Sequence, residues 1–298
     1  MMKRWVLLMG AAALAACSSG AQQANGDGGG GADTGATADS GPPPCPKKYG
    51  TLVVVGDSIS DVGSGSQLDK QQPFYRELLV TNDDAKYPDW KGKDLTKCWG
   101  APNVVKVSKG GAVATEGGSA SVLFDQVKSL PASLPGPVLV VGTIGGNDLQ
   151  KVLPKVVLNQ DVTADMAAFR KGLDDAFGEI TKTDRFGAGV KVDALITNIY
   201  DPSGGTGNFA FTGGTKCPGV LAYFPANTPT DPLLAPWNAA MTEEAAKYAG
   251  VKILDLHAAF KDHGAPATET WFFTDCIHPN AAGHEHLREL FWSPMLSL

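Results

Sequence analysis

Short apolar runs, each long enough for one strand, recur along the chain from residue 51 onward. Runs of this length bounded by Gly, Pro or polar residues are typical of buried strands. The pattern predicts strands over 51–56, 103–107, 138–144, 192–200 and 251–256. The third run has apolar residues on both faces, which favours a strand in the interior of a parallel sheet.

Apolar residues at a spacing of three and four separate these runs and predict helices. The helices are expected over 73–80, 119–130, 163–181, 233–249 and 281–290. Strands that alternate with helices predict an α/β fold, in which a parallel sheet is covered by helices on both sides in three layers. The segments 82–102 and 201–231 lack either pattern, so we expect loops there. A loop as long as 201–231 is typical of a functional segment.

A different pattern occupies the N-terminus. Lys3 and Arg4 precede an apolar stretch over 5–16 that is too short to span a bilayer and is typical of a signal peptide. The stretch ends in Leu14-Ala15-Ala16-Cys17, which resembles a bacterial lipobox with Cys17 as the lipidated residue. Ordinary secretory cleavage, with Cys17 a spare thiol, is the alternative. By the same resemblance, Ser18 after the cysteine favours anchoring to the outer membrane of the cell envelope.

The segment 17–46 is rich in Gly, Ala, Ser, Asp, Thr and Pro and holds almost no large apolar side chain. Such a segment buries too little surface to offset the entropy lost on ordering. We therefore expect a signal peptide over 1–16, a flexible tether over 17–46 and one folded domain over 47–298.

The composition excludes one class of partner. The chain has 298 residues and a formal net charge of -6, and its Lys and Arg residues form no stripe that would neutralise phosphates. We therefore expect no nucleic-acid partner. The G-x-S-x-G elbow of the α/β-hydrolases and the phosphate-binding P-loop motif are both missing from the sequence.

Four cysteines follow Cys17, and in an exported protein an even number predicts two disulfides. They are Cys45, Cys98, Cys217 and Cys276. Their spacing matches no zinc site, and three pairings are possible. The preferred pairing is Cys45–Cys98 with Cys217–Cys276, because these loops are expected to share an end of the sheet.

Residues that suit serine catalysis follow four of the predicted strands. Ser58 follows the first strand, Gly111 the second, Asn147 the third, and Asp275 and His278 the fifth. The carboxyl ends of parallel strands share one edge of a sheet, where ligands bind. A serine nucleophile needs a base, and the base needs an acid to orient it. The pattern predicts Ser58 as nucleophile, His278 as base and Asp275 as its acid.

The oxyanion of such a reaction needs two or three donors. We expect them to be the amides of Ser58 and Gly111 and the side-chain amide of Asn147, with Gly110 as the alternative to Gly111. Taken alone, each of these residues also has a structural interpretation, such as a turn after a strand or a helix cap. We expect Asp61 to hold the turn after the serine.

A metal site is not predicted. His284 and His286 are two residues apart on a helix and do not face one another. Cys276 suits a disulfide better than a nucleophile.

Four segments resemble, in order, the sequence blocks of the GDSL, or SGNH, hydrolases. They are Gly56-Asp57-Ser58-x-x-Asp61, Gly110-Gly111-Ala112, Gly145-Gly146-Asn147-Asp148 and Asp275-x-x-His278-Pro279-Asn280-x-x-Gly283-His284. The resemblance implies the roles given above, no cofactor, and a flavodoxin-like sheet of order 2-1-3-4-5. That order places Ser58 and Asn147 on either side of the crevice between the first and third strands. The chain departs from the family at Lys106, where members often carry Asn.

We therefore expect an exported, lipid-anchored and monomeric serine esterase or lipase that touches the membrane only through its anchor. Its substrates would be small-molecule, lipid or acetylated-glycan carboxylic esters, hydrolysed through an acyl-enzyme. One alternative is a carbohydrate O-acetylesterase, in which the aromatic residues at 271–273 or the loop 208–224 stack on sugars. Another is a non-catalytic surface protein that binds lipid or glycan, which loss of a triad residue would indicate. No triad residue is lost.

Overall fold

The computed structural model describes residues 44–61, 73–116, 121–225 and 228–298. The predicted signal peptide, Cys17 and most of the predicted tether lie outside the described residues. Residues 42–298 cluster as one unit.

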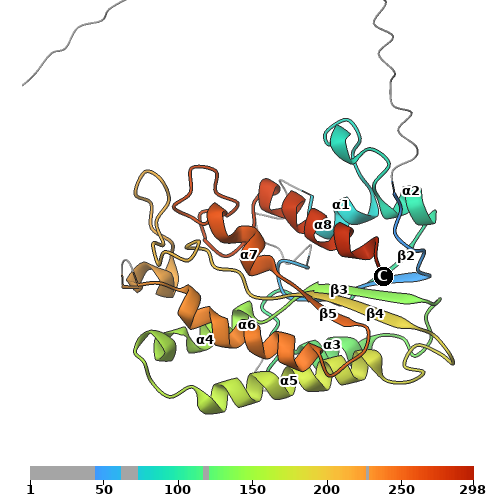
Figure 1. Ribbon diagram of the computed structural model, residues 1–298, viewed down its shortest axis with the longest axis horizontal. Coiled ribbons are helices and arrows are strands. Elements are labelled where there is room, and N and C mark those ends of the chain that lie inside the picture. The colour runs from blue at the N-terminus through green and yellow to red at the C-terminus, as the bar shows by residue number, and fades with distance from the viewer. Residues whose placement is uncertain (1–43, 62–72, 117–120, 226–227) are drawn as a thin grey trace, which may run out of the picture. The chain divides into compact units, whose positions relative to one another are not determined.

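A five-stranded parallel sheet forms the centre of this unit (Figure 1). Its strands are β1 (Thr51–Gly56), β2 (Asn103–Lys106), β3 (Val138–Thr143), β4 (Val192–Thr197) and β5 (Val251–Leu254). Their order is β2-β1-β3-β4-β5, which confirms the predicted fold class. Strand β1 lies between β2 and β3, and its Thr51 is opposite Asn103 of β2 and Val138 of β3. The chain therefore adds β2 on one side of β1 and β3 on the other, which makes the gap between β1 and β3 the topological switch point of the sheet. Ligands bind at this point in open α/β sheets.

Eight α-helices lie in the described part of the chain. They are α1 (Tyr75–Val80), α2 (Leu95–Trp99), α3 (Leu123–Ser129), α4 (Gly146–Val157), α5 (Thr163–Thr181), α6 (Asp231–Ala245), α7 (Leu256–Phe260) and α8 (Ala281–Met295). Short 3₁₀ turns lie at Pro88–Trp90, Gly219–Tyr223 and Lys261–His263. In Figure 1, α1, α2, α7 and α8 cover one face of the sheet, and α3 to α6 cover the other.

Alternate strand residues feed two separate cores, because successive side chains of a strand point to opposite faces. Val53 and Val55 pack with Phe169 of α5 and Trp237 of α6. Leu52 and Val54 of the same strand belong to the core formed with α1, α7 and α8. The sheet is thus buried on both sides, as its apolar strands predict.

Three features of the helices differ from the sequence prediction. Helix α4 was not expected, because Gly145 and Gly146 at its start and Pro154 within it are typical of a loop. Gly145 is the N-cap in the left-handed region, and Pro154 lies in the last turn. Helices α2 and α7 are single turns that were also missed, and α8 continues past residue 290 to Met295.

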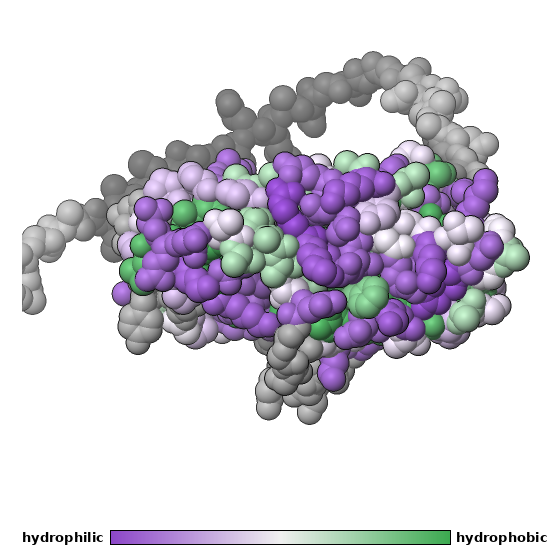
Figure 2. Space-filling view, turned by 90° about the horizontal axis from the view of Figure 1, so that it is seen from below, coloured by the Kyte–Doolittle hydropathy of each residue, from purple (hydrophilic) through white to green (hydrophobic). Residues whose placement is uncertain are grey.

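The surface on the side of α5 is mainly hydrophilic, with apolar residues in small separate patches (Figure 2). The outer side of α4 and α5 carries ion pairs such as Lys155 with Asp165, at 2.9 Å. The apolar face of α5 packs against the core on the opposite side of the helix. Among the described helices, none combines the length and apolar character needed to cross a membrane.

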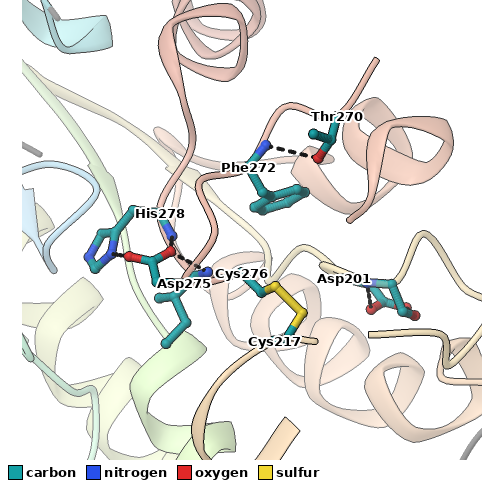
Figure 3. The surroundings of a disulfide bond; sticks show 9 residues. Asp201, Cys217, Thr270, Phe272, Asp275, Cys276 and His278 are labelled. Atoms are coloured by element: carbon teal, nitrogen blue, oxygen red, sulfur yellow. Dashed lines mark hydrogen bonds and ion pairs between the residues drawn. A yellow bond between two sulfur atoms is a disulfide. The ribbon is translucent and has the colours of Figure 1, made fainter. Parts of the chain in front are cut away.

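Two disulfides link distant segments. Cys45 is bonded to Cys98 in α2, and Cys217 of the long loop is bonded to Cys276. Both bonds are consistent with the preferred pairing. The second one lies beside Asp275 and His278 (Figure 3).

Candidate active site

Ser58 lies in the turn after β1, and Gly56 fixes where that turn begins. Gly56 has a φ of +105°, and a Cβ on it would lie 2.0 Å from the Thr143 carbonyl oxygen, so only glycine fits. The Gln126 side chain accepts the Gly56 N–H at 2.7 Å and donates to its carbonyl at 2.9 Å. Ser58 itself remains partly exposed at the end of a fully buried strand.

The three residues predicted for a catalytic triad, Ser58, His278 and Asp275, are linked by hydrogen bonds. His278 Nε2 lies 2.8 Å from Ser58 Oγ, although the two residues are 220 positions apart. His278 Nδ1 lies 2.8 Å from Asp275 Oδ2. In this arrangement His278 can accept the serine proton, and the carboxylate can hold the ring in the required tautomer.

The Asp275 carboxylate is held as an anion by its neighbours. Its Oδ1 accepts the backbone N–H groups of Ile277 and His278, both at 2.9 Å. Burial alone would raise the pKa of this carboxyl, but the hydrogen bonds from the His278 ring and these two amides outweigh it and lower the pKa below its usual value. The Asp275 carboxyl is therefore ionised at neutral pH, next to the His278 ring.

Asn147 lies in the first turn of α4, next to the end of β3. One N–H of its side-chain amide donates to the Ala112 carbonyl at 2.9 Å, which orients the amide. The other N–H of this amide has no partner among the described residues and is available to a ligand. The N-terminal end of α4 also carries a partial positive charge that favours an anion there.

The structure distinguishes the two glycines of the second block. Gly110 N–H donates to Asp61 Oδ2 at 2.8 Å and is therefore engaged. Gly111 has a φ of +75°, is exposed, and its N–H donates to no other atom of the described residues. Gly111 is thus the better placed of the two donors.

Asp61 accepts the Gly110 amide and forms an ion pair with Lys106. Its expected role in the turn after the serine stays a prediction, because the residues that follow it lie outside the described residues. Asp57 stabilises the first part of the turn, because its Oδ1 accepts the Ile59 N–H at 3.1 Å. The lysine that stands where family members often carry Asn is therefore part of the support of the Gly110–Gly111 turn.

A buried hydrogen-bond chain below Ser58 was not predicted. Asp57 Oδ1 accepts the Thr143 hydroxyl at 2.6 Å, Thr143 Oγ1 lies 2.9 Å from Ser60 Oγ, and Ser60 Oγ lies 2.8 Å from the Tyr75 hydroxyl. Burial raises the pKa of Asp57 to about 6, despite these bonds. The chain links β1, β3 and α1, so it fixes the backbone on both sides of the serine.

Tyr200 and the Cys217–Cys276 disulfide hold the loop that carries the acid and the base. The Tyr200 hydroxyl donates to the Ile277 carbonyl, and burial raises the pKa of Tyr200 well above its usual value. Figure 3 shows Cys276 in the same loop, bonded to Cys217 from the segment after β4. The position of Tyr200 at the end of a predicted strand is the sequence signal for its role.

His284 lies apart from the predicted triad. It is buried between Phe74 and Tyr75, and its Nδ1 accepts the Tyr75 N–H at 3.3 Å. Burial lowers its pKa to about 3, so the ring is neutral. Within the described residues, no group of three or more His, Cys, Asp or Glu side chains is placed to hold a metal ion.

Residues 54–286 match the model of the GDSL-like lipase/acylhydrolase family. The chain belongs to this family. The match spans all four blocks, so Ser58, Gly111, Asn147, Asp275 and His278 lie within it. No curated protein matches the sequence significantly.

Several solved structures share the fold of this chain. An acetylxylan esterase from Geobacillus stearothermophilus is 17% identical, with a TM-score of 0.50 over 84% of this chain and 95% of that one. A lipase from a goat rumen metagenome is 16% identical, with a TM-score of 0.50 over 82% and 96% of the two chains. A protein from Lactobacillus plantarum is 17% identical, with a TM-score of 0.50 over 84% and 98%. At these identities the similarity shows the fold.

Proposed function

We propose that this GDSL-family hydrolase is a serine esterase that cleaves carboxylic esters through an acyl-enzyme. The observation that carries the proposal is the continuous row from Ser58 Oγ through His278 to Asp275, with both hydrogen bonds at 2.8 Å. The lipase and the acetylxylan esterase among the structures of the same fold are also ester hydrolases.

The first half of the reaction forms the acyl-enzyme. Ser58 Oγ attacks the ester carbonyl carbon while His278 Nε2 accepts the hydroxyl proton, and the carbonyl oxygen becomes an oxyanion. The Ser58 and Gly111 amides and the free N–H of Asn147 stabilise that charge. The bond to the alcohol oxygen then breaks, and His278 returns the proton to the leaving alcohol.

The second half releases the acid. Water attacks the acyl carbon, His278 accepts a proton from it, and the same donors stabilise the second oxyanion. Ser58 Oγ leaves and takes the proton back from His278. Asp275 stays ionised throughout, since its hydrogen bonds favour the charged form.

The test is hydrolysis of p-nitrophenyl butyrate together with labelling by a fluorophosphonate probe. Ser58→Ala is expected to abolish both, whereas Ser133→Ala, which changes an exposed serine, is expected to leave both unchanged. Full hydrolysis by Ser58→Ala would contradict the proposal.

We further propose that the protein is exported and lipid-anchored at Cys17, which lies outside the described residues. The signal-peptide pattern over 1–16 and the two disulfides support export. Incorporation of an alkyne fatty acid during growth tests the anchor. We expect labelling that is lost in Cys17→Ser, and an unlabelled wild-type protein would contradict it.

A further inference from the structure

An apolar cavity begins at Ser58 and Asn147 and extends under the long loop after β4. The space it encloses, including open solvent at its mouth, is about 890 Å³. Helices α4 and α6 form one part of its wall, and the segment 209–224 forms another. The large apolar side chains of this wall are Leu149, Leu153, Phe209, Leu221, Phe224 and Leu234.

Most polar side chains in the wall are engaged by the protein, although Thr197 Oγ1 is buried without a hydrogen-bond partner among the described residues. Asp201 Oδ1 accepts the Ser203 N–H and its Oδ2 accepts the Gly205 N–H, both at 2.8 Å. The Asn198 amide donates to Asp255 at 2.8 Å, and its oxygen accepts the His257 N–H at 2.9 Å. A sugar in the cavity would need free donors and acceptors, because burying its hydroxyls unpaired is costly. A hydrocarbon chain has no such requirement.

Aromatic packing and a disulfide hold the wall together. The rings of Phe209 and Phe224 meet edge to face with centroids 5.0 Å apart. Cys217 is fully buried beside them and bonded to Cys276 of the catalytic loop. Apolar cavities of this kind are typical ligand sites.

The cavity reaches the proposed nucleophile. Ser58 and Asn147 line it, together with Cys276 and Ile277 of the loop that carries His278, whereas His278 itself is not part of the lining. An acyl group bonded to Ser58 would therefore have the cavity beside it, and the alcohol would leave on the side of His278.

We propose that this cavity binds the aliphatic chain of a medium-chain acyl group, so that the enzyme hydrolyses octanoate esters in preference to acetates. This inference rests on the serine esterase function proposed above. Each methylene buried from water favours binding by roughly fourfold. We expect kcat/KM for the octanoate ester to exceed that for the acetate ester by at least about tenfold. Burial of only a few methylenes of the octanoyl chain is enough to give this ratio.

The test compares p-nitrophenyl acetate with p-nitrophenyl octanoate for the wild type and for two variants of α4. Leu153→Trp fills the cavity and is expected to lower kcat/KM for octanoate about tenfold more than it lowers kcat/KM for acetate. Leu158→Trp places the same side chain at the exposed end of the helix, where Leu158 is 67% exposed, and is expected to change neither. If Leu153→Trp does not fold, Leu149→Phe narrows the cavity nearer to Ser58 and is expected to act in the same way.

Each result decides a separate point. Hydrolysis of acetate with little or none of octanoate, or an equal loss of both esters in folded Leu153→Trp, would overturn the acyl-chain inference and leave the esterase function intact. Failure of both esters, with Ser58 unlabelled by a fluorophosphonate, would overturn the esterase function and the inference together.

Discussion

The Asp57 carboxylate accepts a 2.6 Å hydrogen bond from the hydroxyl of Thr143. Asp57 directly precedes Ser58, and Thr143 is the last residue of β3, so this bond joins the two strand ends that flank the crevice. Thr143 also contacts Ser60 through its hydroxyl and its amide. The position of the serine is thus tied to the strand that leads to Asn147.

Thr143→Val is expected to weaken both stability and catalysis. The valine removes one hydrogen bond from the buried carboxyl of Asp57 and one from the buried hydroxyl of Ser60, which should lower the free energy of unfolding by ~1–3 kcal/mol. A shift of Ser58 should lower kcat by roughly tenfold to a hundredfold. Urea unfolding and p-nitrophenyl butyrate hydrolysis measure the two effects. Thr143→Ser keeps the hydroxyl and serves as the control, and a valine variant equal to it would refute the prediction.

Asp57→Asn is expected to stabilise the protein above about pH 6. Burial raises the pKa of Asp57 from 3.8 to about 6, so between these values the folded protein retains a proton that the unfolded chain has lost. The contribution of this carboxyl therefore lowers the free energy of unfolding as pH rises through this window, by up to ~3 kcal/mol. Asparagine keeps an oxygen for the Thr143 hydroxyl and the Ile59 amide.

Urea midpoints at about pH 4 and about pH 8 measure this difference. The variant and the wild type should be similar at the lower pH, and the variant should be the more stable at the higher one. A variant that is less stable at the higher pH would show that the carboxylate is favoured in the folded state.

Asn147→Ala is expected to lower kcat for p-nitrophenyl butyrate by ~10²–10³-fold, because it removes one oxyanion donor. KM should change little, since the donor acts mainly on the charge that develops in the reaction. Lys151→Ala, an exposed position on the same helix, is the matched control. Equal kcat values for the two variants would contradict the assignment of Asn147 as an oxyanion donor.

The two disulfides are expected to differ in their effect on activity but not on stability. They close loops of similar sequence separation, 53 and 59 residues, so replacing either cysteine pair by serine should cost up to ~4 kcal/mol. Only the Cys217–Cys276 bond holds the loop of Asp275 and His278. Its loss should lower kcat/KM for p-nitrophenyl butyrate by roughly tenfold or more at a temperature where both variants are folded. Equal activities of the two variants would refute this.

Much of the fold could be predicted because its strands are short apolar runs with clear ends. Helix α4 could not, since Gly145, Gly146 and Pro154 oppose a helix locally and only packing against the core stabilises one. The left-handed conformation of Gly145 turns the chain from β3 into this helix. That turn brings Asn147 to the crevice.

The contact between Ser58 and His278 could be predicted, because serine and histidine are residue types with few alternatives in this chemistry and both follow predicted strands. Supporting residues such as Thr143, Tyr200 and Gln126 could not, because their roles depend on partners from other strands. The choice between Gly110 and Gly111 also needed the structure, since it depends on which amide Asp61 accepts.

The bond between Cys217 and Cys276 has a consequence for protein engineering. It makes the cavity wall and the catalytic loop parts of one covalent ring that runs from residue 217 through α6 and β5 to residue 276. A loop transplanted from a relative to alter substrate choice would therefore have to keep a cysteine at position 217, or bring residues 201–278 with it as a single cassette. Directed evolution of this enzyme should accordingly begin with substitutions on α4, which borders the cavity outside that ring.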